Sequence, residues 1–147
     1  MQIFVINLPG AKERFKLQKD QLTKLDLKYK ILNAISVEDI SKDAYKKHYY
    51  DWQRPLRKTE VACYFSHQSA WNRVIKSKKP ALILEDDAIL SRFLPKLLDS
   101  LNSIQNIDLI NLENRGRKKF VSRSHVNIEC NSKLLRLYQD RTGAAGY

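Results

Sequence analysis

Three consecutive carboxylates, Glu85, Asp86 and Asp87, are the side chains of this sequence best suited to chemistry. They follow the apolar run 81–84, which comes after Pro80 and has the length of a buried strand. A buried strand offers no water to charge, so we expect the carboxylates to emerge at its carboxyl end, where open α/β sheets bind ligands. Adjacent like charges repel, and a divalent cation with oxygen ligands would offset them. A solvated acidic turn is the alternative interpretation.

A second set of chemically capable side chains recurs at the spacing of one helical face. Its members are Glu60, Cys63, His67, Trp71 and Val74. An acid, a histidine and a tryptophan together are unusual on the face of a plain core helix. Cys63 itself is interpreted as a small buried filler, because no basic residue is placed to stabilise its thiolate.

The elements that must position these residues alternate between strand and helix. Strands are predicted over 3–6, 29–32, 81–84, 107–112, 127–129 and 134–138, and helices over 11–25, 59–76 and 93–104. Ser36 with Asp39, and Thr59 with Glu60, have the pattern of helix N-termini. The last two strands are predicted to pair as a hairpin through 131–132. The alternation of elements predicts an α/β fold with a mostly parallel sheet flanked by helices.

Length, charge and cysteine content limit the class of protein. The 147 residues suffice for one domain with a hydrophobic core, and no apolar stretch approaches the roughly 20 residues that span a bilayer. The net charge of +11 favours anionic partners: nucleic acid, an anionic membrane surface or phosphorylated substrates. Cys63 and Cys130 form no disulfide or CxxC pattern, and the N-terminus has no signal pattern. We therefore expect a cytoplasmic protein, whose charge suits peripheral attachment to the inner face of the membrane.

Several segments, taken in order, resemble glycosyltransferase family 25, the family of lipooligosaccharide and collagen galactosyltransferases. The most specific one runs from Leu56 to Trp71 and resembles the family's L-x-x-x-E-x-x-C-x-x-S-H-x-x-x-W helix. It is followed at the right distance by 82–88, which is similar to the family's acidic strand end. Shorter matches are Val5-Ile6-Asn7-Leu8 with Arg14, Asn33-Ala34, and the T-G-x-x-G-Y segment 142–147. Together the matches cover nearly the whole chain.

The resemblance implies a GT-A fold, a UDP-sugar donor, most often UDP-galactose, and a Mn²⁺ or Mg²⁺ ion. Asp87 stands first among the implied metal ligands. Asp86 stands second, as a ligand or as an acceptor of hydrogen bonds from ribose or from metal-bound water. The residues implied to lie at the donor are Leu8, Arg14, Asn33, Ala34, Ser66, His67, Glu85 and Asp86.

The helical face of Glu60 and His67 has two interpretations under this resemblance. It borders the donor site, with Ser66 and His67 reaching a phosphate or the sugar, and with Glu60 and His67 as catalytic candidates. Alternatively it is structural, with His67 bonded to Glu60 or to a backbone carbonyl beneath the sheet.

The resemblance further implies a single nucleotide-sugar-binding glycosyltransferase domain over 1–147. Its implied reaction is metal-dependent transfer of a hexose, galactose first, to lipooligosaccharide, lipopolysaccharide or another glycan. Family members usually continue beyond the glycine–tyrosine segment, so the chain is interpreted as truncated at its C-terminus. One alternative is a truncated donor-binding domain with little or no turnover. Another is a basic nucleic-acid-binding domain, but no nucleic-acid motif is recognised, so nucleic acid is not an expected partner.

Overall fold

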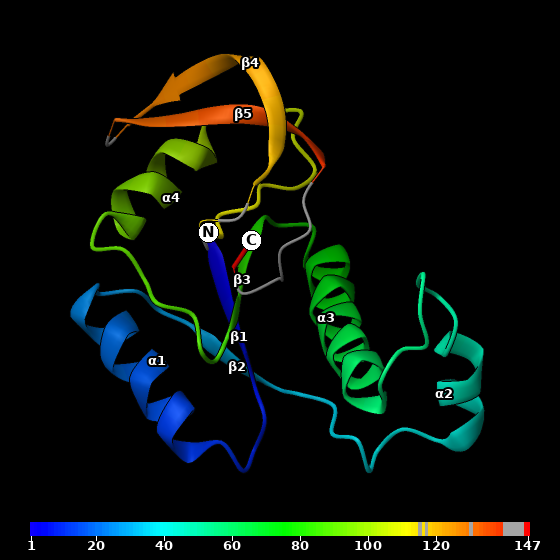
Figure 1. Cartoon of the computed structure of the whole chain (residues 1–147). Helices are drawn as coiled ribbons and strands as arrows, with labels where there is room; N and C mark the ends of the chain where they lie inside the picture. The colour runs from blue at the N-terminus through cyan, green and yellow to red at the C-terminus, as the bar shows by residue number, and fades with distance from the viewer. Residues whose placement is uncertain (115, 117, 130, 140–145) are drawn as a thin grey trace.

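The computed structural model describes residues 1–114, 116, 118–129, 131–139 and 146–147. Here a three-stranded parallel sheet carries helices on both faces, and an antiparallel hairpin forms a second sheet (Figure 1). The elements are β1 (Gln2–Asn7), α1 (Lys12–Lys24), β2 (Lys30–Asn33), α2 (Lys42–His48), α3 (Lys58–Ser77), β3 (Ala81–Glu85), α4 (Leu94–Asn102), β4 (Phe120–Ile128) and β5 (Ser132–Gln139). The predicted α/β fold, with a mostly parallel sheet flanked by helices, is confirmed. No helix among the described residues is long and apolar enough to cross a membrane.

The parallel sheet has the strand order β2-β1-β3, with β1 in the centre. After β1 the chain passes through α1 to β2 on one side, and it later returns to β3 on the other side of β1. The register pairs Asn7 with Asn33 and Ile6 with Glu85, so the three strands end near one level. This reversal of strand order places a topological switch point between the carboxyl ends of β1 and β3, the position at which such sheets bind ligands.

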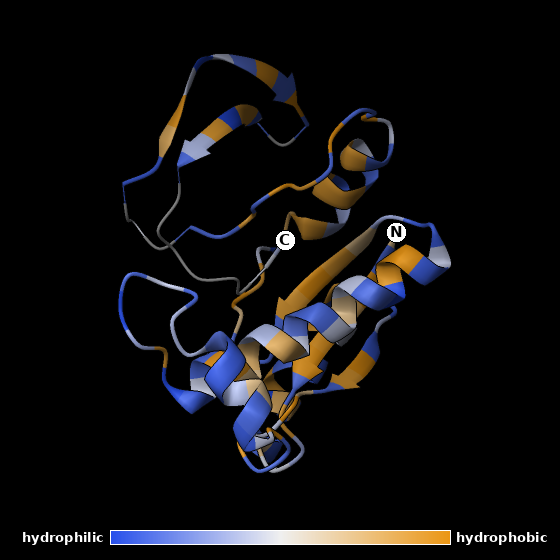
Figure 2. Ribbon diagram, turned by 90° about the vertical axis from the view of Figure 1, so that its right-hand side faces the viewer, coloured by the Kyte–Doolittle hydropathy of each residue, from blue (hydrophilic) through white to orange (hydrophobic). Residues whose placement is uncertain are grey.

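Strand β1 is apolar from Ile3 to Ile6 because both of its faces are covered. Ile3 and Val5 pack with α1 and α4 on one face, and Phe4 and Ile6 pack with Ala70 of α3 on the other. Figure 1 shows this layering, and Figure 2 shows apolar residues concentrated on the strands of the parallel sheet. The buried sheet is therefore a rigid support for whatever its strand ends carry.

The two predicted helix starts lie elsewhere in the structure. Helix α2 begins after Ser41, whose hydroxyl accepts a backbone N–H at 3.1 Å, and not at Ser36. Helix α3 begins after Arg57 and not after Thr59. Glu60 explains the earlier start, because its carboxylate accepts the backbone N–H of Arg57 at 2.7 Å and so caps the free end of the helix.

The predicted strand over 107–112 is wrong, since this segment joins neither sheet. The edge of β3 that faces away from β1 is instead bonded to Tyr147. The backbone of Ile83 donates to Tyr147 at 2.6 Å and accepts from it at 3.0 Å. The backbone N–H of Leu112 donates to the carbonyl of Gly146 at 3.1 Å. Residues 146–147 therefore separate the segment 107–112 from β3.

The hairpin of β4 and β5 confirms the predicted pairing, with longer strands than predicted. Asn131 in its turn has φ = 53°, a left-handed conformation that asparagine adopts more readily than most residues. Of the segment 142–147, which resembles the family's T-G-x-x-G-Y segment, residues 142–145 lie outside the described residues.

Candidate functional site

A cleft of about 560 Å³ opens at the carboxyl ends of the parallel strands. Its walls come from the loops after β1 and β2, from one side of α3, and from the acidic turn after β3. The predicted site residues that line it are Leu8, Arg14, Ala34, Ser66, His67, Glu85, Asp86 and Asp87. These residues are spread over nearly eighty positions of sequence, and the switch-point geometry brings them to one place.

Two of the predicted residues do not line the cleft. Asn33 is exposed at the end of β2, although the neighbouring Ala34 does line it. The carboxylate of Glu60 instead binds Arg54, with contacts of 2.9 and 2.6 Å to the two guanidinium nitrogens. These hydrogen bonds lower the pKa of Glu60 to about 2. The prediction that His67 is bonded to Glu60 is therefore wrong, and His67 lies instead next to Glu85.

Asp86 is buried beneath the cleft floor and both of its carboxylate oxygens have partners. Asn7 donates to one oxygen at 2.7 Å, and Arg14 lies 3.3 Å from the other. An amide and a guanidinium thus replace the water that a carboxylate loses at the end of a buried strand. Asn7 was not among the predicted site residues. The sequence did offer a signal for Asn7, because this polar residue ends the apolar run of β1 in the same way as Glu85 ends that of β3.

Asp87 has the opposite environment, since it is exposed and lines the cleft. It makes no hydrogen bond or ion pair with the residues that the structure describes. Asp87 also borders a second hollow of about 620 Å³, which lies between β3 and α4. Its carboxylate oxygens are accordingly available to a ligand, and oxygen donors of this kind suit Mg²⁺ or Mn²⁺.

Two glutamines of α1 fix the acidic turn from behind. The side-chain amides of Gln18 and Gln21 both donate to the carbonyl of Ala88. Gln21 also accepts the backbone N–H of Leu90 at 2.8 Å. The chain on the far side of Asp87 is therefore held to α1, which limits how far the carboxylate can move.

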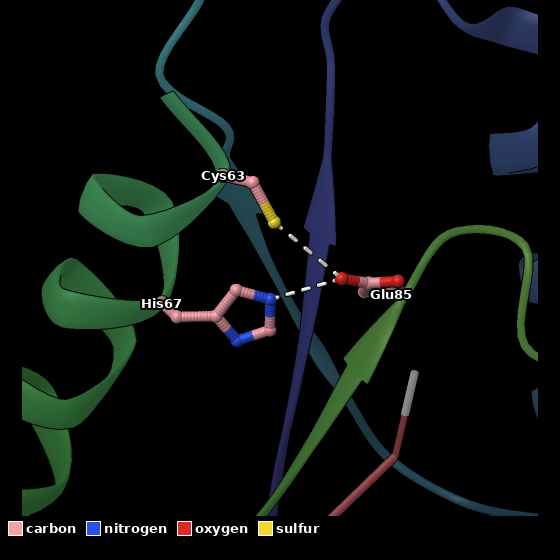
Figure 3. Close-up of side chains that lie close together, drawn as sticks. All are labelled: Cys63, His67 and Glu85. Carbon is pink, nitrogen blue, oxygen red and sulfur yellow. Dashed lines mark hydrogen bonds and ion pairs between the residues drawn. The ribbon is translucent and has the colours of Figure 1, made fainter. Parts of the chain in front are cut away.

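A chain of hydrogen bonds runs behind the cleft and ends on Glu85, which lines it. Trp71 donates its indole N–H to the hydroxyl of Tyr147 at 2.7 Å, and Nδ1 of His67 lies 2.7 Å from the same oxygen. Nε2 of His67 lies 3.0 Å from Oε1 of Glu85 (Figure 3). One direction of donation satisfies every group: indole to hydroxyl, hydroxyl to Nδ1, and Nε2–H to the carboxylate. His67 is buried, so this chain fixes the orientation of Glu85 toward the cleft.

Cys63 differs from its predicted role as a buried filler, because the residue is exposed and lines the cleft. Its sulfur nevertheless points at Glu85, with Sγ 3.7 Å from Oε1 (Figure 3). Partial burial, repulsion of the thiolate by the carboxylates of Glu85 and Asp87, and the hydrogen bond to Glu85 together raise the pKa of the thiol to about 11. The thiol therefore keeps its proton at neutral pH, as expected where no basic residue stabilises the thiolate.

Ser66 links the loop after β2 to α3. Its hydroxyl accepts the backbone N–H of Ile35 at 2.8 Å and donates to the carbonyl of Ala62 one turn earlier at 2.9 Å. The side chain is buried and both of its hydrogen-bonding functions are used within the protein. Its observed contacts therefore shape the wall of the cleft.

The fold and the cleft define an α/β protein with a cleft at the switch point of a parallel sheet, the position at which such folds bind ligands. The sequence model of glycosyltransferase family 25, described as an LPS biosynthesis protein, matches residues 1–147, so the chain belongs to this family. Human procollagen galactosyltransferase 2 is 27% identical over 118 residues, which cover 71% of this chain and 19% of that protein. Procollagen galactosyltransferase 1-A of Xenopus laevis is 27% identical over 135 residues, which cover 80% of this chain and 21% of that protein. The chain thus spans about a fifth of the length of these curated relatives.

Proposed function

We propose that this chain binds a nucleotide-sugar donor in the switch-point cleft and transfers its hexose to a glycan acceptor. Galactose from UDP-galactose is the proposed donor sugar, because the two relatives described above are procollagen galactosyltransferases. Lipooligosaccharide or lipopolysaccharide is the proposed acceptor, since the family is described by LPS biosynthesis. The observation that carries the proposal is the convergence of Arg14, Asp86 and Asp87 in one cleft of a family 25 chain.

The charges of the cleft suit a diphosphate held through a cation. Asp87 offers an exposed carboxylate with no described partner, and we propose it as the residue that holds Mn²⁺ or Mg²⁺. Asp86 has both oxygens engaged by Asn7 and Arg14, so its proposed role is to fix the floor and the guanidinium of Arg14. The bound ion supplies Lewis-acid stabilisation of the leaving diphosphate. Arg14, which is half exposed, is placed to add positive charge at the phosphates.

Of the two catalytic candidates, His67 lines the cleft and Glu60 does not. We propose that His67 acts with Glu85, which accepts its hydrogen bond and faces the cleft. A carboxylate oriented in this way can hydrogen-bond a hydroxyl of the bound sugar or accept the proton of an acceptor hydroxyl. Glu60 is bound to Arg54 on the surface, and its proposed role is to start α3.

Sugar transfer by the 147-residue chain tests the proposal. Release of UDP from UDP-galactose is measured with Mn²⁺ or with EDTA, in the presence and absence of lipooligosaccharide that lacks its terminal galactose. We expect metal-dependent release that the acceptor accelerates and that Asp87→Ala lowers at least tenfold. Asp99→Ala is the matched control, because Asp99 is an exposed acid on α4 that does not line the cleft.

Three other outcomes separate the alternatives. Metal-dependent binding of UDP-galactose without transfer would identify a donor-binding domain, which is of interest because the chain spans about a fifth of its relatives. Transfer that EDTA leaves unchanged would overturn the role of the cation. Steeply salt-dependent binding of RNA or DNA with no response to uridine nucleotides would overturn the proposal in favour of the basic surface.

A further inference from the structure

Three potential metal ligands of different chemistry meet on the cleft wall, apart from the acid that we assign to the donor-binding cation. They are Cys63 and His67 of α3 and Glu85 at the end of β3, and one ligand atom from each lies within 4.8 Å of the other two (Figure 3). Cys63 and His67 are one helical turn apart, which directs both side chains to the same side of α3. All three residues line the cleft, so an ion can reach them from solvent.

We propose that Cys63, His67 and Glu85 bind a zinc-type transition-metal ion, with a fourth coordination position open to the cleft. This site is separate from the hard-cation site at Asp87, and binding of the ion does not require sugar transfer. The site uses His67 and Glu85, so a bound ion would take the place of the role proposed for this pair at the sugar. Thiolate, imidazole and carboxylate are the three ligand types that Zn²⁺ combines in proteins. A thiolate ligand disfavours Mg²⁺ and Ca²⁺, which prefer oxygen.

Two of the three separations between the ligand atoms are close to those around a tetrahedral ion. With Zn–S near 2.3 Å and Zn–N or Zn–O near 2.0–2.1 Å, the edges of the tetrahedron are about 3.3 Å for N···O and about 3.5 Å for S···O. The structure gives 3.0 Å between Nε2 of His67 and Oε1 of Glu85, and 3.7 Å between Sγ of Cys63 and the same oxygen. The third separation, between Sγ and Nε2, is bounded by 4.8 Å, against an edge of about 3.5 Å, so the side chain of Cys63 must turn toward His67 to seat the ion. The ion would replace the two protons that now bridge these atoms. The thiol proton would be released, and the proton of Nε2 would be transferred to Nδ1, so one proton leaves per ion bound.

The surroundings of His67 are those of a metal-binding histidine. When Nε2 binds the ion, Nδ1 must carry the proton and needs an acceptor. The hydroxyl oxygen of Tyr147 lies 2.7 Å from Nδ1, and it can accept this bond together with that of Trp71 because it has two lone pairs. The imidazole ring is buried, and its orientation is therefore already fixed before an ion binds. The thiolate and the carboxylate together balance the double charge of the ion.

Titration of the metal-free chain with Co²⁺ tests the site directly. Tetrahedral cobalt with a thiolate ligand gives intense visible bands and a sulfur-to-cobalt charge-transfer band in the near ultraviolet. We expect both signals at one Co²⁺ per chain and their loss when Zn²⁺ is added. Cys63→Ser should remove the charge-transfer band, while His67→Gln should weaken cobalt binding at least tenfold. Tyr147→Phe should weaken it about tenfold and keep the band.

Two control variants isolate the site. Cys130→Ser changes the other cysteine of the chain, and Asp87→Asn changes the acid assigned to the hard cation; both should keep the charge-transfer band. Absence of the band in the unmodified chain would overturn the proposal, as would its persistence in Cys63→Ser.

A second measurement needs no variant and covers the case in which a substitution prevents folding. Alkylation of the native chain by iodoacetamide is followed by mass spectrometry with and without Zn²⁺. We expect Zn²⁺ to slow labelling of Cys63 at least tenfold relative to Cys130. Equal labelling of Cys63 with and without Zn²⁺ would contradict the site.

Discussion

Alanine substitution should lower stability at Asp86 and ligand binding at Asp87. The two acids are neighbours in sequence, but Asp86 is buried and bonded whereas Asp87 is exposed and lines the cleft. Asp86→Ala should lower the free energy of unfolding. Asp87→Ala should leave that free energy unchanged and abolish metal-dependent binding of UDP-galactose.

The contacts of Asp86 set the size of its effect. Its removal leaves the amide of Asn7, which is 6% exposed, without its 2.7 Å acceptor. A buried donor left without a partner costs about 1–3 kcal/mol. The ion pair with Arg14 adds less than about 1 kcal/mol, because the arginine side chain is half exposed. We therefore expect a loss of about 1–3 kcal/mol, or roughly 3–10 °C in Tm for a chain of this length. Asp87→Ala should change stability by less than about 0.5 kcal/mol.

Urea unfolding followed by circular dichroism measures the first effect, and the midpoint should fall without a change in the m-value. Isothermal titration with UDP-galactose and Mn²⁺ measures the second. Asp86→Asn is an informative companion, because its side-chain oxygen can still accept from Asn7. This variant should therefore recover part of the stability that Asp86→Ala loses.

Equal and large losses of donor binding in the two alanine variants would refute the division of roles. So would a stability loss in Asp87→Ala as large as that in Asp86→Ala. The first result would mean that both acids contact the ion or the donor. The second would mean that Asp87 has structural partners of its own.

Three further predictions follow from single contacts. Tyr147→Phe leaves Nδ1 of the buried His67 without its partner and should lower the unfolding free energy by about 1–3 kcal/mol, measured in urea. Ser66→Ala removes the acceptor for the N–H of Ile35 and should cost a similar amount, with faster hydrogen exchange of that amide as the check. The pKa of Glu60 is lowered to about 2, so its contribution is present above its unfolded value near 4.5 and is lost as pH falls through 2. Acid titration of Glu60→Gln should accordingly show a smaller stability change between pH 4.5 and 2, whereas an unchanged acid limb would refute that role.

The parts of the fold that follow local patterns could be predicted from the sequence. Short apolar runs predicted the strands β1 and β3. Apolar residues at helical spacing predicted the helices α1 and α4. The acidic end of β3 also predicted that the carboxylates lie at the carboxyl end of the strand, where the cleft opens, because charge cannot remain inside a buried strand. The segment 107–112 shows the limit of such reasoning. It has the composition of a strand, but Gly146 and Tyr147 lie between it and β3.

The contacts of the site required the tertiary structure. No spacing in the sequence indicates that Asn7 reaches Asp86, or that Tyr147 joins His67 from eighty residues away. Helical spacing did place Cys63 and His67 on one face of α3. It could not show that the partner of this face is Glu85, because that depends on how the helix packs against the sheet.

Thermal unfolding of the chain with Mn²⁺, with UDP, and with both together tests the donor site most directly. A ligand present at 100 times its dissociation constant adds about 2.7 kcal/mol, or roughly 5–10 °C for a chain of this length. We predict that UDP with Mn²⁺ raises Tm by several degrees and that EDTA removes this increase. An unchanged Tm with UDP and with UDP-galactose, each in the presence of Mn²⁺, would contradict the assignment of the switch-point cleft to a nucleotide-sugar donor.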